Sequence, residues 1–400
     1  MIEENFMRLI PLDFEKEIKH RVESIRVNME KSDCDSILIG SNVNIYYTSG
    51  RFFRGYCYIS LLNDPIWFII KPNVFEQDDN LIPIRKPEQI PEFLTSRGYK
   101  LPGKIAFEFD DLSYSDINRF MKIFPLAEYF NGSTIMKKTR MIKSAWEIEQ
   151  MKEDGRHQAR AYAKVSHCYK PGMTDLQLQI ELERELRLEG ALGVSRVSGN
   201  LMEINMGSVI SGDNADVAGP YEFTMTGAGT DPSLPVGADN HEILPGTTVM
   251  IDMNGTFNGY QTDMTRVWAL GELIPMALKA HQCSVRILRT LEKMAIPGCP
   301  VASLYDTAVA IAKEEGLEEF FMGHNNQVGF IGHGVGIQLN ELPVVNARSK
   351  DILEENMTIA LEPKFVIPKV GAVGIENTYR VTFNGLENLT VFPEEIAGLK

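Results

Sequence analysis

The stretch at residues 249–267 constrains the fold most, because it places two aspartates, Asp252 and Asp263, eleven positions apart among apolar residues. Apolar side chains alternate along residues 249–253, and a β-branched run resumes this rhythm after Gly259. The pattern predicts two antiparallel strands joined through the Asn-Gly pairs between them. Both aspartates are then expected on one face.

Two neighbouring carboxylates repel each other, and burying them costs on the order of several kcal/mol unless protons or cations neutralise them. A metal ion would supply that neutralisation. The alternative is that Asp263 pairs with Arg266 while Asp252 lies at a solvated strand end. This stretch alone supports both interpretations, so the choice depends on residues further along the chain.

Two glutamates and a histidine favour the metal. Glu362 and Glu376 each lie at strand spacing among apolar residues, where a charge is costly without a partner. His333 stands between glycines that let the backbone come close. A lone histidine would more often be a core residue. One imidazole with four inward carboxylates, however, matches a two-metal site for ions such as Mn, Fe, Co or Zn.

The second part of the chain is expected to be duplicated. Pro171-Gly172 and Pro297-Gly298 each follow a long helical stretch and precede a second helix. A strand pair bearing two of the four acids comes after each of these units. The sequence therefore predicts two α/β halves related by a pseudo-twofold axis, with their sheets facing one carboxylate cluster.

A domain boundary is expected after residue 140. A basic connector precedes Ser144 and Glu147, which form a capping box that opens a long helix. Before this point strands alternate with helical stretches and include a hairpin at residues 56–70. The prediction is an α+β protein, with a mixed α/β domain at residues 1–140 and the duplicated, metal-binding domain at residues 141–400.

Composition and charge exclude some classes of binding partner and indicate the compartment in which the protein works. The net charge of -14, without a basic run, argues against nucleic acid and anionic membranes as partners. Five scattered cysteines indicate neither a disulfide framework nor a cysteine zinc site. The N-terminus has no apolar core of signal-peptide length, and residues 56–70 are too short for a membrane span. We therefore expect a soluble, cytoplasmic protein.

Taken in order, these residues resemble the pita-bread metallopeptidases, which include aminopeptidase P, prolidase and methionine aminopeptidase. The shared pattern is Asp, a second Asp eleven residues on, His in Gly-His-Gly-x-Gly, Glu-Pro, and Glu in Gly-Ile-Glu-Asn. The resemblance covers residues 145–395, and residues 44–50 are similar to part of the creatinase-type N-terminal domain. It implies a pita-bread catalytic domain preceded by a creatinase-type domain.

The resemblance also implies roles for the five residues. Asp252 would bind one metal ion, Asp263 and Glu376 would bridge two ions, and His333 and Glu362 would bind the other. The two divalent ions would be manganese in the first instance, with cobalt, zinc or iron as alternatives. Glu362 would also move the proton during catalysis.

A homodimer is a further implication of the resemblance. The N-terminal domain of one subunit would rim the active site of the other, which makes Arg51 and Arg54 candidates for substrate contact.

The chain departs from the proline-specific members at three positions where they carry histidine. Gly329 and Asn340 stand at two of them, and the third falls on Gly219 or Pro235 within an apparent insertion at residues 213–240. Asn340 can donate a hydrogen bond to a substrate but cannot donate a proton as imidazolium does, and it is a candidate both as a catalytic residue and as a substrate contact.

The lost histidines have two candidate replacements, His241 and His324, each in a polar, loop-like stretch. The insertion is expected to shape the pocket or a dimer contact, with an ordinary surface loop as the alternative.

Three functional hypotheses follow. The first is a dinuclear-metal hydrolase of the Xaa-Pro peptidase type that cleaves an amide bond in a short peptide. The second keeps the metal site but makes the protein a small-molecule lyase or amidohydrolase, because the substrate-orienting histidines are missing. The third is a non-enzymatic binding module, which five intact ligands make the weakest of the three.

Overall fold

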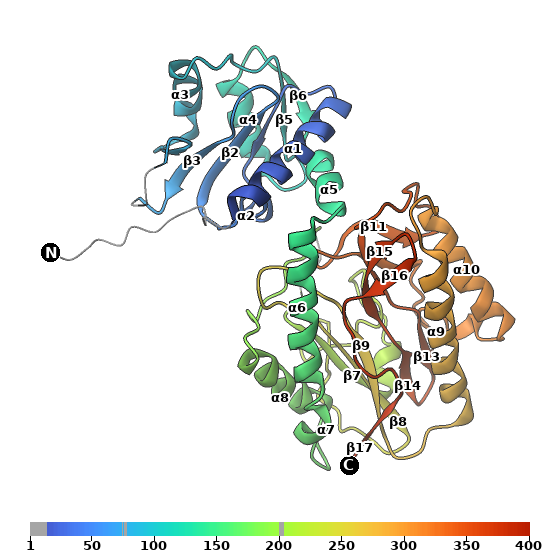
Figure 1. The fold of residues 1–400 in the computed structure, drawn as a ribbon. Helices are drawn as coiled ribbons and strands as arrows, with labels where there is room; N and C mark the ends of the chain where they lie inside the picture. Colours follow the sequence, from blue (N-terminus) through green and yellow to red (C-terminus); the bar gives the residue numbers. More distant parts are fainter. Residues whose placement is uncertain (1–13, 74, 76–77, 200–203) are drawn as a thin grey trace. The chain divides into compact units, whose positions relative to one another are not determined.

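The computed structural model describes residues 14–73, 75, 78–199 and 204–400. These residues divide into two compact units, one ending at Arg140 and the other running from Met141 to Lys400. Figure 1 shows the course of the chain through both units.

The N-terminal unit is built on a six-stranded mixed sheet with the strand order β4-β3-β2-β1-β5-β6. β2 and β3 form the hairpin expected at residues 56–70, while β1 pairs with β2 antiparallel and with β5 parallel. Leu38, Phe68 and Phe107 are buried in its core. Its strands are β1 (Ser36–Ile39), β2 (Arg54–Ser60), β3 (Ile66–Lys71), β4 (Leu81–Pro83), β5 (Lys104–Phe107) and β6 (Glu128–Asn131), and its helices are α1 (Glu15–Lys31), α2 (Asn42–Ser49), α3 (Ile90–Ser96), α4 (Tyr114–Ile123) and α5 (Ser133–Met141), with a short 3-10 turn η2 (Pro87–Gln89).

The C-terminal unit holds a four-stranded sheet in the order β17-β9-β8-β7, a five-stranded sheet in the order β11-β10-β12-β15-β16, and the separate hairpin β13-β14. In Figure 1, α6, α7 and α8 lie on one side of these strands, and α9 and α10 lie on the other. The helices are α6 (Ala145–Tyr162), α7 (Val165–Cys168), α8 (Asp175–Leu188), α9 (Pro275–Met294) and α10 (Val301–Glu314).

The strands of this unit are β7 (Gly207–Ser211), β8 (Thr247–Met253), β9 (Thr265–Leu270), β10 (Phe330–Gly334), β11 (Glu341–Asn346), β12 (Thr358–Leu361), β13 (Lys364–Ile367), β14 (Gly371–Gly374), β15 (Asn377–Thr382), β16 (Gly385–Asn388) and β17 (Ala397–Leu399), and the 3-10 turns are η3 (Gly212–Asp216) and η4 (Glu318–Phe320).

The two predicted halves are present in this unit. The first contains α6, α8 and the antiparallel pair β8–β9; the second contains α9, α10 and the antiparallel pair β12–β15. The side chains of Ser144 and Glu147 form the expected capping box at the start of α6, and Thr174 and Gln177 form another at the start of α8. Each box satisfies backbone N–H groups that the first turn of a helix leaves unpaired.

Helix α6 also holds the connection between β8 and β9. The amide of Gln158 donates to the carbonyl of Met253 at 2.5 Å and accepts from the hydroxyl of Thr262 at 2.9 Å. The buried carboxylate of Asp154 accepts from the backbone N–H of Phe257 at 2.9 Å. Helix α6 therefore fixes the connection between Asp252 and Asp263 by hydrogen bonds from its side chains.

Among the residues that the structure describes, no helix is both long and apolar enough to cross a membrane. The five cysteines are free thiols.

Gly155 lets α6 lie directly against the backbone that follows β16. A Cβ built on this buried glycine would stand 2.0 Å from the carbonyl oxygen of Leu389, far inside van der Waals contact. The close packing of α6 on this segment thus requires a residue without a side chain.

We predict that Gly155→Ala lowers the free energy of unfolding, although alanine is the better helix former by about 1 kcal/mol. Overpacking against a backbone carbonyl should cost at least about 1–3 kcal/mol, measured by urea or thermal unfolding. The exposed neighbour Arg156 supplies the control, since Arg156→Ala should change stability by no more than about 0.5 kcal/mol. A Gly155→Ala protein as stable as the wild type would contradict the packing described here.

Candidate metal centre

The ends of four strands and one residue within a fifth strand bring the five predicted residues together. Asp252 lies near the end of β8 and Asp263 just before β9, while Glu362 follows β12 and Glu376 precedes β15. His333 lies in β10, which pairs with β12. Their ligand atoms form two groups, Asp263–His333–Glu376 and Asp252–Glu362–Glu376, whose members lie within 4.8 Å of one another.

The alternative in which Asp263 pairs with Arg266 is wrong. The guanidinium of Arg266 is buried and donates to the carbonyls of Thr265 and Glu376 at 2.8 Å and to the side chain of Asn377 at 2.8 Å. Arg266 therefore holds the backbone of the two halves together at Glu376. The carboxylate of Asp263 faces the other acids instead.

The group Asp263–His333–Glu376 fits a divalent cation. One oxygen of each buried carboxylate, Asp263 Oδ1 and Glu376 Oε1, has no hydrogen-bond partner among the described residues. His333 Nε2 lies 3.7 Å from Asp263 Oδ2 and 3.8 Å from Glu362 Oε1. These separations are too long for hydrogen bonds. They suit ligand atoms that each stand about 2.0–2.2 Å from one shared ion.

The orientation of His333 supports the same conclusion. Its Nδ1 lies 3.1 Å from the carbonyl oxygen of Gly334, an acceptor that assigns the ring proton to Nδ1. Nε2 then presents its lone pair to the two carboxylates. A backbone acceptor behind the ring is the usual way in which a metal-binding histidine is oriented.

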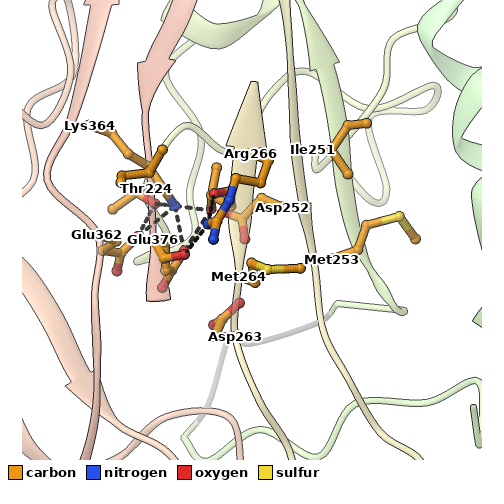
Figure 2. A network of polar contacts seen from close by, with 12 residues as sticks. Thr224, Ile251, Asp252, Met253, Asp263, Met264, Arg266, Glu362, Lys364 and Glu376 are labelled. Atoms are coloured by element: carbon orange, nitrogen blue, oxygen red, sulfur yellow. Dashed lines mark hydrogen bonds and ion pairs between the residues drawn. The ribbon is translucent and has the colours of Figure 1, made fainter. Parts of the chain in front are cut away.

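The group Asp252–Glu362–Glu376 already holds a cation from the chain itself, the ammonium of Lys364. Its Nζ donates to Asp252 Oδ2 at 2.8 Å, to Glu362 Oε2 at 2.8 Å and to Glu376 Oε2 at 2.9 Å (Figure 2). The side chain of Lys364 is fully buried. Burial lowers the pKa of Lys364, but the three carboxylates outweigh this effect and raise the pKa well above its ordinary value.

Sequence reasoning missed Lys364. A signal was present, because a residue two positions after Glu362 points to the same face if the strand continues. At the place where a second metal ion was predicted, beside Asp252, the structure has a lysine that already neutralises the carboxylates.

Thr224, from the insertion at residues 213–240, completes this cluster. Its buried hydroxyl donates to Glu362 Oε2 at 2.6 Å and accepts from Lys364 Nζ at 3.1 Å. The insertion therefore reaches the centre itself. Nothing in the sequence pattern distinguished Thr224 from its neighbours.

Two acids of the cluster, Asp263 and Glu376, have raised pKa values. Burial and the neighbouring carboxylates of Glu376 and Asp252 raise the pKa of Asp263 well above its ordinary value. Burial, partly offset by the ammonium of Lys364, raises the pKa of Glu376 to about 8. Without a metal ion, the cluster therefore holds on to protons that isolated carboxylates would release.

A cavity of about 460 Å³ opens beside the cluster, within the range typical of small-molecule sites. Asp252, Asp263, His333, Glu362 and Glu376 line it together with apolar residues. The insertion supplies much of the wall, as expected if it shapes the pocket. The apolar lining residues are Ile204, Pro220, Phe223, Met225, Val236, Phe330, Leu339 and Val344.

Asn340 also lines the cavity, but its amide is already engaged. Its Oδ1 accepts from the backbone N–H of Ser198 at 2.6 Å, and its Nδ2 donates to the carbonyl of the same residue at 2.8 Å. At most one N–H of Asn340 is left for a substrate. Its role in substrate contact stays a prediction.

Neither candidate replacement histidine is among the residues that line this cavity. His241 is exposed and lies beside Asp239 at 2.8 Å, and His324 lies 3.0 Å from Asp216. Gly329 has open space where a side chain would be.

Arg51 and Arg54 belong to the N-terminal unit. Arg51 lies between α2 and β2, and the exposed Arg54 begins β2. Their role as substrate contacts also stays a prediction.

The sequence matches two protein families. The pattern of metallopeptidase family M24 matches residues 149–383, more than half of the chain. The pattern of the creatinase/prolidase N-terminal domain matches residues 21–142.

Individual relatives cover nearly the whole chain. The Xaa-Pro dipeptidase of Pyrococcus furiosus is 26% identical over 385 residues, which are 95% of this chain and 100% of that protein. The crystal structure of prolidase from Pyrococcus horikoshii superposes with a TM-score of 0.75 at 22% identity, covering 94% of this chain and 99% of its own. The Xaa-Pro dipeptidase from Bacillus anthracis gives a TM-score of 0.78 at 22% identity, covering 96% and 100%.

We predict that the metal-free protein loses stability as the pH rises from about 4.5 to about 8. Over this range Glu376 is still protonated in the folded state but ionised in the unfolded chain, because its pKa rises from 4.5 to about 8 on folding. The folded state then binds more protons, so stability falls with pH. Thermal unfolding of chelator-treated protein would measure this. Glu376→Gln should flatten the slope, and equal slopes for the two proteins would contradict the assignment.

Proposed function

The chain belongs to metallopeptidase family M24, and from this premise we propose that it is a metal-dependent peptidase of the Xaa-Pro type, cleaving an amide bond in a short peptide. The observation that carries the proposal is the group Asp263–His333–Glu376, which includes two unpartnered carboxylate oxygens and whose residues line a cavity large enough for a small peptide. The comparisons favour a peptidase over the lyase or amidohydrolase alternative.

The family implies divalent metal ions, and the ligands named above suit manganese first, with cobalt, zinc or iron as alternatives. Asp263, His333 and Glu376 would hold an ion, with Glu362 Oε1 facing the same point. A bound divalent ion would polarise the scissile carbonyl and lower the pKa of a coordinated water.

Glu362 is positioned to move the proton. Its Oε2 is held by Thr224 and Lys364, so that Oε1 is the oxygen turned toward His333 and the cavity. We assign to Oε1 the acceptance of a proton from the attacking water and its transfer to the leaving nitrogen. The two hydrogen bonds to Oε2 keep the carboxylate in that orientation.

The cavity walls suit an apolar residue of the substrate. Phe223, Phe330 and Val344 offer flat, apolar surface that would accept a proline ring. The Xaa-Pro dipeptidase of Pyrococcus furiosus and the prolidases among the solved structures support a proline-containing substrate. Asn340 would then contact the substrate through its remaining N–H.

The proposal extends to the wider organisation of the protein. The domain boundary would fall between residues 140 and 141, the protein would work in the cytoplasm, and two copies would form a homodimer. In such a dimer Arg51 and Arg54 would contact a substrate bound by the other subunit.

We predict that the metal-loaded protein releases amino acid from a panel of Xaa-Pro dipeptides and tripeptides. Asp263→Ala should lower kcat/KM by more than about 100-fold. This exceeds the loss expected for a residue that only supports a metal ligand, which is about 10- to 100-fold. Asp306, an exposed acid of α10, supplies the matched control, since Asp306→Ala should keep full activity. No turnover of any peptide by metal-loaded wild type would reject the proposed function.

A second prediction concerns Asn340. Asn340→Ala removes the two hydrogen bonds to Ser198 and the remaining N–H, and we expect kcat/KM to fall about tenfold, mainly through a higher KM. Steady-state kinetics on the best peptide of the panel would measure it. Unchanged kcat and KM would remove Asn340 from the site.

A further inference from the structure

We infer that Lys364 takes the place of one metal ion, so that this centre binds a single divalent ion, at Asp263, His333 and Glu376. The inference rests on the proposed function, since it takes that group as the site of the catalytic ion. It departs from the two-ion centre that the sequence resemblance implied.

Geometry leaves no room for a second ion among Asp252, Glu362 and Glu376. An ion bound there would stand about 2.0–2.2 Å from one oxygen of each. Lys364 Nζ already lies 2.8–2.9 Å from an oxygen of each of the three carboxylates, and its three N–H groups are shared among these oxygens and the hydroxyl of Thr224. Ion and ammonium would overlap or press together as like charges.

The lysine is held from both ends. Its backbone begins β13 and pairs with Gly374 of β14, which approaches so closely that a Cβ on Gly374 would lie 2.9 Å from Lys364 Cα. Its carbonyl accepts from the backbone N–H of Met322 at 2.8 Å. Since the side chain is also fully buried, swinging the ammonium away would require the hairpin to shift.

The two groups differ in what they still lack. The three carboxylate oxygens around Lys364 have a hydrogen-bonded cation, whereas Asp263 Oδ1 and Glu376 Oε1 have no partner among the described residues. An ion bound by Asp263 and Glu376 would displace the protons that these acids retain without it, so one divalent ion would neutralise the part of the cluster that Lys364 does not reach. The chain has thus completed one half of the centre with its own side chain and left the other half open.

The replacement changes what the centre can do. An ammonium neutralises carboxylates and donates hydrogen bonds, but it cannot coordinate a water molecule or a carbonyl oxygen as a metal ion can. Asp252 then serves to hold Lys364 rather than to bind an ion. Lys364 acts as a positioning residue, because its contact with Glu362 Oε2 turns Oε1 toward the reaction.

The count of bound ions tests the inference. Wild-type protein equilibrated with excess Mn²⁺ and then desalted should retain one ion per chain by elemental analysis, with the electron paramagnetic resonance spectrum of an isolated Mn²⁺. Lys364→Ala removes the ammonium and opens its space, so it should retain two ions and show the spectrum of a coupled pair.

Lys143 provides the matched control. It is also buried, but it pairs with a single carboxylate, Glu341, at 3.0 Å. Lys143→Met should therefore keep one ion per chain, and circular dichroism would establish that each variant is folded.

Two ions in the wild type, or one ion in a folded Lys364→Ala protein, would overturn the inference. If Lys364→Ala does not fold, the wild-type count decides alone. Two ions together with peptide hydrolysis would leave the proposed function standing and remove only the single-ion centre. No bound ion and no hydrolysis would reject both.

Discussion

Four carboxylates gathered at one place, of which Asp263, Glu362 and Glu376 are buried and Asp252 is partly exposed, are the constraint on which the C-terminal unit depends. Each would destabilise the fold by about 1–3 kcal/mol or more if it were left ionised and unpaired. The fold meets that cost by ending strands from both halves at one place, so that a few cations can serve all four acids. Lys364 supplies part of the positive charge from within the chain. The unpartnered oxygens of Asp263 and Glu376 mark where charge from outside is still required.

The sequence was sufficient for features with a local or periodic signature. The alternation around Asp252 predicted β8 and β9, and the Ser144–Glu147 pattern predicted the start of α6. The five converging residues were found because each is a charged or metal-binding group where an apolar residue would be expected. Lys364 escaped because a lysine after Glu-Pro has an ordinary solvent-exposed interpretation. The spacing of two residues from Glu362 was a signal only if one strand continued through both, whereas β12 ends at Leu361 and Lys364 begins the separate hairpin β13–β14.

The cavity wall beside the cluster differs from what the resemblance alone would suggest. A side chain at Gly329 would meet open space, and the amide of Asn340 forms two hydrogen bonds with the backbone of Ser198. The insertion at residues 213–240 contributes apolar wall instead. Sequence comparison could identify the lost histidines but not this outcome, because the partner of an amide side chain is set by loops distant along the chain. The residues of the carboxylate cluster therefore match the resemblance more closely than those of the cavity wall do.

The hydroxyl of Thr224 links the cluster to the cavity wall. It belongs to the cavity wall, yet it donates to Glu362 Oε2 within the cluster. A hydrogen bond to Oε2 fixes the direction in which the other oxygen, Oε1, points. The outline of the cavity and the orientation of Glu362 are consequently set by the same short segment of the chain.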